Sequence, residues 1–195
     1  SFIGIGVRIN EKIKIADNCL IGAGSVVTKN TAKDTIYAGV PAKKIGKIWK
    51  KKIAIFTTTR SDVSILTPLM KRIQKTRRLD YLFFVGGTHL NKTYGNTLNE
   101  LRNNRLKVHG HFNYLDKGDN KRNLSKSLAT AHQKVNEIFS KHQFDIVCIL
   151  GDRFEKLAIV NNAIIYNKPI FHLHGGEITE GAIDNQIRNM ISKSS

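Results

Sequence analysis

Aliphatic side chains recur every six residues over the first part of the chain. One register comprises Ile3, Ile9, Ile15, Ile21 and Val27, and a second comprises Val7, Ile13 and Cys19. An α-helix repeats about every 3.6 residues and a strand about every two, so neither explains this period. A coiled parallel β-solenoid does, because each flat face takes six residues and directs one apolar residue inward. The pattern therefore predicts a short β-solenoid over residues 1–48.

From Ile53 onward, short apolar runs alternate with amphipathic stretches. The apolar runs predict strands at Ile53–Phe56, Leu79–Val85, Leu106–Phe112, Ile146–Leu150 and Ile170–Leu173. Helical spacing predicts helices at Asp62–Lys75, Thr97–Asn104, Asn123–Lys141, Phe154–Tyr166 and Ile183–Ile191. This order predicts fold class α/β, with a Rossmann-like, doubly wound parallel sheet over residues 53–195. The basic residues 49–52 are expected to form a linker between the two regions.

The charge of the chain is strongly positive but unevenly distributed. The 195 residues include 32 Lys and Arg against 15 Asp and Glu, which gives a net charge of +17. Nucleic acids, anionic membranes and anionic small molecules are therefore candidate partners. Residues 151–195 hold five basic and five acidic side chains, so the whole excess precedes residue 151.

Cysteine usage and hydropathy narrow the protein class. Cys19 and Cys148 lie in apolar runs, which predicts free core thiols and a reducing, cytoplasmic setting. No apolar run reaches the length of a membrane helix. The chain begins at Ser1 without Met and stops at Ser195 inside a helical pattern, so we expect a fragment of a longer protein.

Polar clusters follow three of the predicted strands, where active residues of parallel sheets belong. After the first strand, Thr59 and Arg60 precede a helix, and this combination suits an anionic oxygen group such as a diphosphate. A capped turn explains the same residues equally well. The glycine fingerprint of dinucleotide-binding loops is absent.

The second cluster is Gly151-Asp152-Arg153, which follows the most apolar strand. The third runs from His172 through His174, Gly175 and Gly176 to Glu177, with Asp184 beyond it. Strand alternation would direct His172 and His174 to one side, and a metal site is disfavoured because zinc needs three or four ligands. Glycines let the backbone approach a ligand closely. Carboxylates gathered near Asp152 can act as a paired acid and base.

The first fifty residues resemble a known family. The segment Ile15–Ile48, and within it "AGVPAKKIG" (Ala38–Gly46), resembles the C-terminal end of hexapeptide-repeat acetyltransferases of the sialic-acid and bacillosamine type, which are left-handed β-helices. In that family the catalytic His lies in upstream coils, whereas here no His precedes His89. The resemblance thus implies a structural remnant, a trimerising module or a CoA-contacting tail. An acetyl-CoA-dependent sugar acetyltransferase remnant remains an alternative reading.

Residues 51–195 carry a second resemblance. The stretches "LGDRFE" and "HLHGGEITEGAIDNQIR" resemble the N-terminal domain of hydrolysing UDP-N-acetylglucosamine 2-epimerases. That family has two Rossmann-like domains of glycosyltransferase-B type, with the active site between them. It eliminates UDP from a UDP-2-acetamido sugar to form a glycal, then hydrates the glycal to N-acetylmannosamine for sialic or other bacterial nonulosonic acid synthesis. The resemblance implies no metal, nicotinamide or other cofactor.

The resemblance also implies roles for individual residues. Arg60 matches a nucleotide-contacting Arg, Asp152 a catalytic Asp, and Glu177 and Asp184 acidic positions of the site. Some relatives carry a catalytic Glu at the position of His174, so the division of roles between His174 and Glu177 stays open. The remaining expected substrate-binding residues are Thr59, Gly151, Arg153, Gly175 and Gly176.

Several expectations about the whole protein follow from that resemblance. The second domain lies outside this chain, so residues 1–195 alone are expected to have little epimerase activity. The expected partner is a UDP-2-acetamido sugar, with neither nucleic acid nor membrane, and a homo-oligomer is expected in the full-length protein. The alternative is a basic module that binds RNA or another polyanion, whose affinity would fall steeply with salt.

Overall fold

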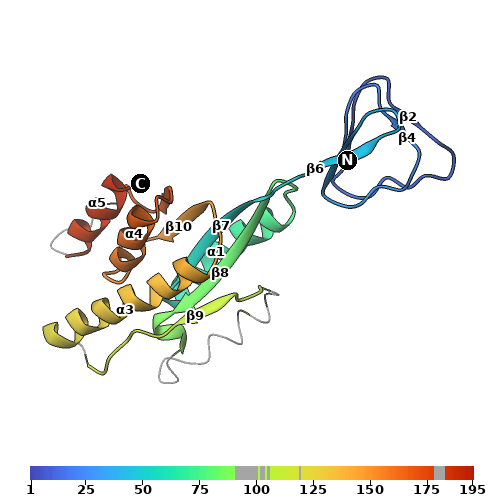
Figure 1. The fold of residues 1–195 in the computed structure, drawn as a ribbon. Helices are drawn as coiled ribbons and strands as arrows, with labels where there is room; N and C mark the ends of the chain where they lie inside the picture. The colour runs from blue at the N-terminus through green and yellow to red at the C-terminus, as the bar shows by residue number, and fades with distance from the viewer. Residues whose placement is uncertain (91–100, 102–103, 105, 119, 178–182) are drawn as a thin grey trace. The chain divides into compact units, whose positions relative to one another are not determined.

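The computed structural model describes residues 1–90, 101, 104, 106–118, 120–177 and 183–195. It divides the chain into two compact units, Ser1–Lys50 and Lys51–Ser195, hereafter the N-terminal and C-terminal units (Figure 1). Two residues of the expected linker, Lys51 and Lys52, open the first strand of the C-terminal unit.

The N-terminal unit is a coil of short strands. These are β1 (Phe2–Ile3), β2 (Arg8–Ile9), β3 (Leu20–Ile21), β4 (Val26–Val27), β5 (Thr35–Ala38) and β6 (Lys43–Lys47). Phe2 pairs in parallel with Leu20, and Arg8 pairs in parallel with Val26. Both offsets are 18 residues (20 − 2 and 26 − 8), which is three faces of six residues each. The parallel coil predicted from the period of six is therefore present, and β6 closes it by pairing antiparallel to β5.

The inward positions of this coil differ from the prediction in two respects. Ile3 and Ile9, which were expected to point inward, are 48% and 40% exposed. On two later faces two residues are buried where one was expected, because alternate residues of an extended segment point to the same side. Cys19 and Ile21 form one such pair, and Ser25 and Val27 form the next. The Ser25 hydroxyl accepts a hydrogen bond from the Gly39 N–H at 3.2 Å, so the polar member of its pair is satisfied inside the coil.

The C-terminal unit contains β7 (Lys51–Thr57), α1 (Arg60–Gln74), β8 (Leu79–Gly86), the 3-10 helix η1 (Gly87–Leu90) and β9 (Gly110–Phe112). It continues with α3 (Lys121–Lys141), β10 (Ile146–Leu150), α4 (Lys156–Ile165), β11 (Ile170–Leu173) and α5 (Asp184–Lys193). The sheet order is β11-β10-β7-β8-β9, and every pairing is parallel. The predicted doubly wound α/β fold is confirmed. The strand predicted at 106–112 is only three residues long, and most of the helix predicted at 97–104 lies outside the described residues.

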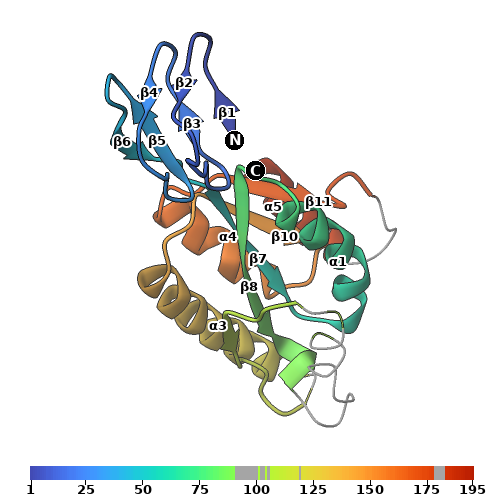
Figure 2. The same cartoon turned by 90° about the vertical axis from the view of Figure 1, so that its right-hand side faces the viewer.

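Helices cover both faces of this sheet, as Figure 2 shows. On one face α1 packs over Ile55, Phe83 and Val85, and the helix continues through Pro68. On the other face α3, α4 and α5 cover Ala54, Phe56 and Phe84. Neighbouring residues of β7 thus enter opposite cores, because successive strand side chains point to opposite faces.

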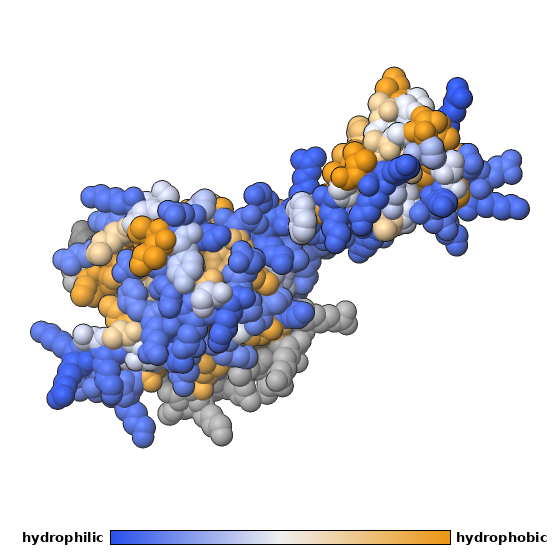
Figure 3. Space-filling model, in the orientation of Figure 1, coloured by the Kyte–Doolittle hydropathy of each residue, from blue (hydrophilic) through white to orange (hydrophobic). Residues whose placement is uncertain are grey.

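The surfaces of the two units are mostly hydrophilic in the view of Figure 3, with separate apolar patches. Exposed apolar side chains of the N-terminal unit include Phe2, Ile5, Val40 and Ile45. Within the described residues, no helix combines the length and the hydropathy needed to cross a membrane.

Candidate functional site

Three of the predicted polar clusters meet at one edge of the sheet. Strands β7, β10 and β11 are consecutive neighbours and all parallel, so their carboxyl ends lie side by side. The loops that follow them carry residues 58–59, 151–155 and 174–177. The topology therefore brings residues 58–59 to the same edge as residues 151–155, although these two segments are 92 positions apart in the sequence (151 − 59).

The loop after β7 is organised around Asp62, which is 8% exposed. One carboxylate oxygen, Oδ2, accepts hydrogen bonds from the backbone N–H groups of Thr58 (3.0 Å) and Thr59 (3.3 Å). The other, Oδ1, accepts a hydrogen bond from the Thr59 hydroxyl at 3.0 Å, and Thr59 caps helix α1. The polar groups of Thr59 that suited an external anion thus already face the protein's own carboxylate. The capped-turn interpretation describes this part of the loop.

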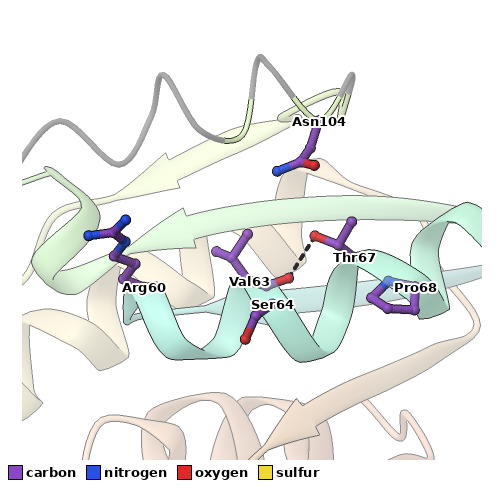
Figure 4. A pocket seen from close by; sticks show the side chains of 6 residues that line it. All are labelled: Arg60, Val63, Ser64, Thr67, Pro68 and Asn104. Carbon is purple, nitrogen blue, oxygen red and sulfur yellow. Dashed lines mark hydrogen bonds between the residues drawn. The ribbon is translucent and has the colours of Figure 1, made fainter.

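Arg60 follows this loop as the exposed first residue of α1. It lines a pocket of about 440 Å³ along the first half of the helix, together with Val63, Ser64, Thr67, Pro68 and Asn104. Figure 4 shows the guanidinium at one end of this pocket and Asn104 across from the helix. The arrangement leaves a cationic side chain at the rim of an open pocket, which suits an anionic ligand.

The loop after β10 opens with Gly151, whose φ of +76° favours glycine and whose Cα faces open space. Asp152 follows and forms an ion pair with Arg188 of α5. The Arg188 side chain is only 5% exposed and that of Asp152 is 22% exposed. Arg188 also donates a hydrogen bond to the Glu177 carbonyl oxygen. One buried guanidinium therefore ties the Asp152 loop to the Gly-Gly-Glu loop.

The next residues of the same loop form two further ion pairs. Arg153 Nε lies 2.8 Å from the carboxylate of Glu155, and Lys156 Nζ lies 3.0 Å from Asp62. Burial alone would raise the pKa of Glu155, but the positive charges of Arg153 and Lys156 bring its pKa below the ordinary value. Tyr114 packs beside this carboxylate, and burial followed by the charge of Glu155 raises the Tyr114 pKa. A buried polar layer therefore lies beneath the loops.

The two histidines of the third cluster have different partners, contrary to the expectation that strand alternation would direct them to one side. Strand β11 ends at Leu173, and His174 has a left-handed backbone with φ of +61°. His174 Nδ1 lies 2.7 Å from Glu177 Oε1, and both side chains are exposed. His172 instead bridges the Gly151 carbonyl oxygen and the Ser192 hydroxyl, each at 2.9 Å. His172 is thus a structural cross-link, and His174 is the histidine available to a ligand.

The two glycines of this loop also differ. A Cβ on Gly175 would lie 2.6 Å from Ser192 Oγ and 2.8 Å from His172 Nδ1, so its small size serves packing against the protein. A Cβ on Gly176 would meet no atom within 4 Å, so the backbone there is open to a ligand.

Asp184 opens α5 and lines a second pocket, of about 350 Å³. The other walls are Arg153, Phe154, Ile187, Ile183, Leu124, Leu128 and Ser125, which make the pocket largely apolar. This pocket joins Asp184 to the Asp152 loop through Arg153. The His, Cys, Asp and Glu side chains of the described residues form no group of three or more that could hold a metal ion.

Three charged residues of the site were not singled out from the sequence: Glu155, Lys156 and Arg188. Asp62 stood in the first polar cluster, as the first residue of the predicted helix, with no role assigned to it. Asp62, Lys156 and Arg188 occupy helical positions where charged residues are usually solvent-facing. Arg188 carried one usable signal, because it lies four residues after Asp184 on the inner side of an amphipathic helix, between the buried Ile187 and Ile191.

The C-terminal unit has a wholly parallel sheet with helices on both faces, and carboxylate–arginine pairs lie at the carboxyl ends of its strands. These features define a Rossmann-like enzyme domain. The chain belongs to the UDP-N-acetylglucosamine 2-epimerase family, whose sequence model matches residues 71–195.

Similar proteins agree with this assignment. The GDP/UDP-N,N'-diacetylbacillosamine 2-epimerase (hydrolyzing) of Campylobacter jejuni is 36% identical over 146 residues, which are 75% of this chain and 38% of that protein. The UDP-GlcNAc 2-epimerase of Neisseria meningitidis, solved bound to UDP-GlcNAc, has the same fold with a TM-score of 0.62 at 17% identity, covering 74% of this chain and 38% of that one. The chain thus spans less than two fifths of the length of these relatives.

The N-terminal unit has relatives of its own. The galactoside O-acetyltransferase of Escherichia coli is 47% identical over 47 residues, which are 24% of this chain and 23% of that protein. The predicted similarity of the N-terminal part of the chain to acetyltransferases is confirmed.

Proposed function

We propose that residues 51–195 form the N-terminal domain of a hydrolysing 2-epimerase acting on a UDP-2-acetamido sugar. The observation that carries this proposal is the meeting of Asp152, Arg188 and the Gly-Gly-Glu loop at the carboxyl edge of the sheet. Family membership supports this proposal. The C. jejuni relative, which is named as a hydrolysing 2-epimerase, supports it as well.

The reaction requires removal of the C2 proton, departure of UDP from C1 and later addition of water across the resulting double bond. Asp152 is our candidate for the base, because its ion pair with Arg188 orients a carboxylate at the site. In the first step the C2–H and C1–O bonds break, a C1=C2 bond forms, and UDP carries away the electron pair of the C1–O bond. In the second step water supplies hydroxide to C1, and a proton returns to C2 from the opposite face.

The returning proton needs a second acid. His174 and Glu177 are our candidates, because both side chains are exposed and His174 Nδ1 lies 2.7 Å from Glu177 Oε1. Which of the two donates stays open. Arg60, at the rim of its pocket, is proposed to meet the negative charge of the diphosphate.

The sugar is proposed to be UDP-N-acetylglucosamine or a 4-acetamido-6-deoxy relative of it. The name of the C. jejuni relative supports the second possibility. The largely apolar pocket beside Asp184 and Arg153 suits the methyl groups of such a sugar. We further propose a role in nonulosonic acid synthesis, a cytoplasmic location and a homo-oligomeric full-length protein.

The proposal is tested by following UDP release from both nucleotide sugars. We expect turnover by the full-length protein and little by residues 1–195, because the relatives are more than twice as long as their match to this chain. Absence of UDP release from the full-length protein with either sugar contradicts the proposed reaction. Robust turnover by residues 1–195 alone contradicts the need for a second domain. Filter binding of RNA at two salt concentrations distinguishes the polyanion-binding alternative, since that affinity falls steeply with salt.

The N-terminal unit is proposed to act as a structural or oligomerising module derived from an acetyltransferase. Its parallel coil and its similarity to acetyltransferases support this origin. Its chain contains no His, which such a transferase would need as a base.

A further inference from the structure

A buried lysine joins two loops of the candidate site. Lys156 is fully buried as the first residue of α4, directly after the loop that carries Asp152. Its ammonium lies 3.0 Å from the carboxylate of Asp62, which is in the first turn of α1, two residues after Arg60. These residues are 94 positions apart in the sequence. The ion pair therefore connects the loop after β7 with the loop after β10.

On the first loop, the Asp62 carboxylate gathers donors from three consecutive threonines. Thr58 and Thr59 donate their backbone N–H groups, and Thr57 donates its hydroxyl at 3.3 Å. This carboxylate thus helps to fix the chain immediately before Arg60, together with Thr88, whose N–H and hydroxyl both donate to the Thr58 carbonyl oxygen at 3.0 Å. Burial raises the pKa of Asp62, but Lys156 and these hydrogen bonds lower it below the ordinary value, so the carboxylate is ionised at neutral pH.

On the second loop, a backbone hydrogen bond fixes the position of Lys156. Its N–H donates to the Arg153 carbonyl oxygen at 2.9 Å, which closes the turn that begins at Arg153, directly after Asp152. The ladder between β7 and β10 pairs Ile55 with Cys148, before either loop begins. The Asp62–Lys156 pair thus extends the connection between the two strands to the loops beyond them.

We propose that Asp62 and Lys156 are a positioning pair, which sets the relative placement of Arg60 and Asp152 for the reaction. The proposal rests on the proposed function, in which Arg60 meets the diphosphate and Asp152 acts at C2 of the same substrate. A buried ion pair is a weak source of stability, because desolvation of both charges offsets their attraction, and a well-packed uncharged pair often serves the fold as well. Positional control is what a charged pair adds here.

The coupling is tested first without any ligand, in the 195-residue chain, by residue-resolved amide hydrogen exchange. For each variant, exchange is measured in the loop that does not carry the substitution, which is called the opposite loop. Lys156→Met should raise exchange at the Thr58 and Thr59 amides, and Asp62→Asn should raise it at the Lys156 amide. The matched control is Lys134→Met, which removes a surface lysine paired with Glu137. A rise confined to the opposite loop, not shared by the amides of β8, supports coupling. Exchange unchanged on the opposite loop, or raised equally throughout the unit, overturns it.

The functional part is tested in the full-length protein by comparing the single variants with the double variant Asp62→Asn/Lys156→Met. The double variant removes both charges, so its thermal midpoint should recover toward wild type relative to either single variant. We expect its kcat for UDP release to remain at least tenfold below wild type. Recovery of kcat together with stability would show a merely structural pair and would overturn the proposal. If the wild-type protein releases no UDP, the proposed function fails, while the exchange experiment still decides whether the loops are coupled.

Discussion

Replacement of Arg188 by Met tests whether the ion pair with Asp152 organises the site. The arginine side chain is 5% exposed, and its removal leaves Asp152, 22% exposed, without this cation. Breaking a buried ion pair from one side costs about 3–5 kcal/mol. Because water already reaches part of Asp152, we place the loss just below this range, at about 2–3 kcal/mol. For a domain of this size that corresponds to a fall of roughly 6–9 °C in the midpoint of thermal unfolding.

The assay is thermal unfolding followed by circular dichroism. Arg122→Met is the matched control, because Arg122 is an exposed residue of α3 and its loss should change the stability by less than about 0.5 kcal/mol. The double variant Asp152→Asn/Arg188→Met should recover part of the loss, since it leaves no uncompensated charge. A midpoint of Arg188→Met within about 1 °C of wild type would refute the reasoning, because the pair would then hold nothing in place.

Three further predictions follow from the same structure. In the full-length protein, Asp152→Asn should abolish UDP release while leaving UDP affinity nearly unchanged, and unchanged turnover would exclude Asp152 as the base. Burial raises the pKa of Cys148 to about 12, so iodoacetamide at pH 8 should label this thiol only after unfolding, as mass spectrometry of the Cys148 peptide would show. Asp62 and Glu155 have lowered folded pKa values, so their stabilisation is present above their unfolded pKa values of about 4 and is lost as pH falls through the folded ones. Melting curves between pH 2 and pH 6 should therefore show a fall below about pH 4 that is smaller in Asp62→Asn, and an equal fall in both proteins would contradict this assignment.

The strands of this protein were predictable because buried strands appear in the sequence as uninterrupted apolar runs. Ile146–Leu150 is buried on both faces, and the sequence pattern places it at the same residues as the structure does. The strand Gly110–Phe112 is shorter than predicted, because Leu106 and Val108 pack into the core beside α1 without joining the ladder. An apolar run signals burial, and only the backbone pairing decides whether the run is a strand.

The site was predictable only in part, for a related reason. Asp152 and Glu177 follow strands directly, so their position at the carboxyl edge follows from the order of elements. Lys156 and Arg188 lie within helices, and their burial depends on partners 94 and 36 residues away. No local pattern distinguishes such a cation from a solvated one, because the partner is supplied by the fold.

The placement of these cations shows that part of the net positive charge of the chain lies away from the candidate site. Three positive charges at the candidate site, Arg153, Lys156 and Arg188, each face a carboxylate and add little net charge there. A large exposed group of cations lies instead at the end of α1 and the start of β7, where the Lys51 N–H bonds the Arg78 carbonyl: Lys51, Lys52, Lys71, Arg72, Lys75, Arg77 and Arg78. That group is at the amino edge of the sheet, opposite the loops that carry Asp152 and Glu177. These seven cations therefore lie away from the proposed nucleotide-sugar site, where Arg60 is proposed to meet the ligand and Arg153, Lys156 and Arg188 are each paired with a carboxylate.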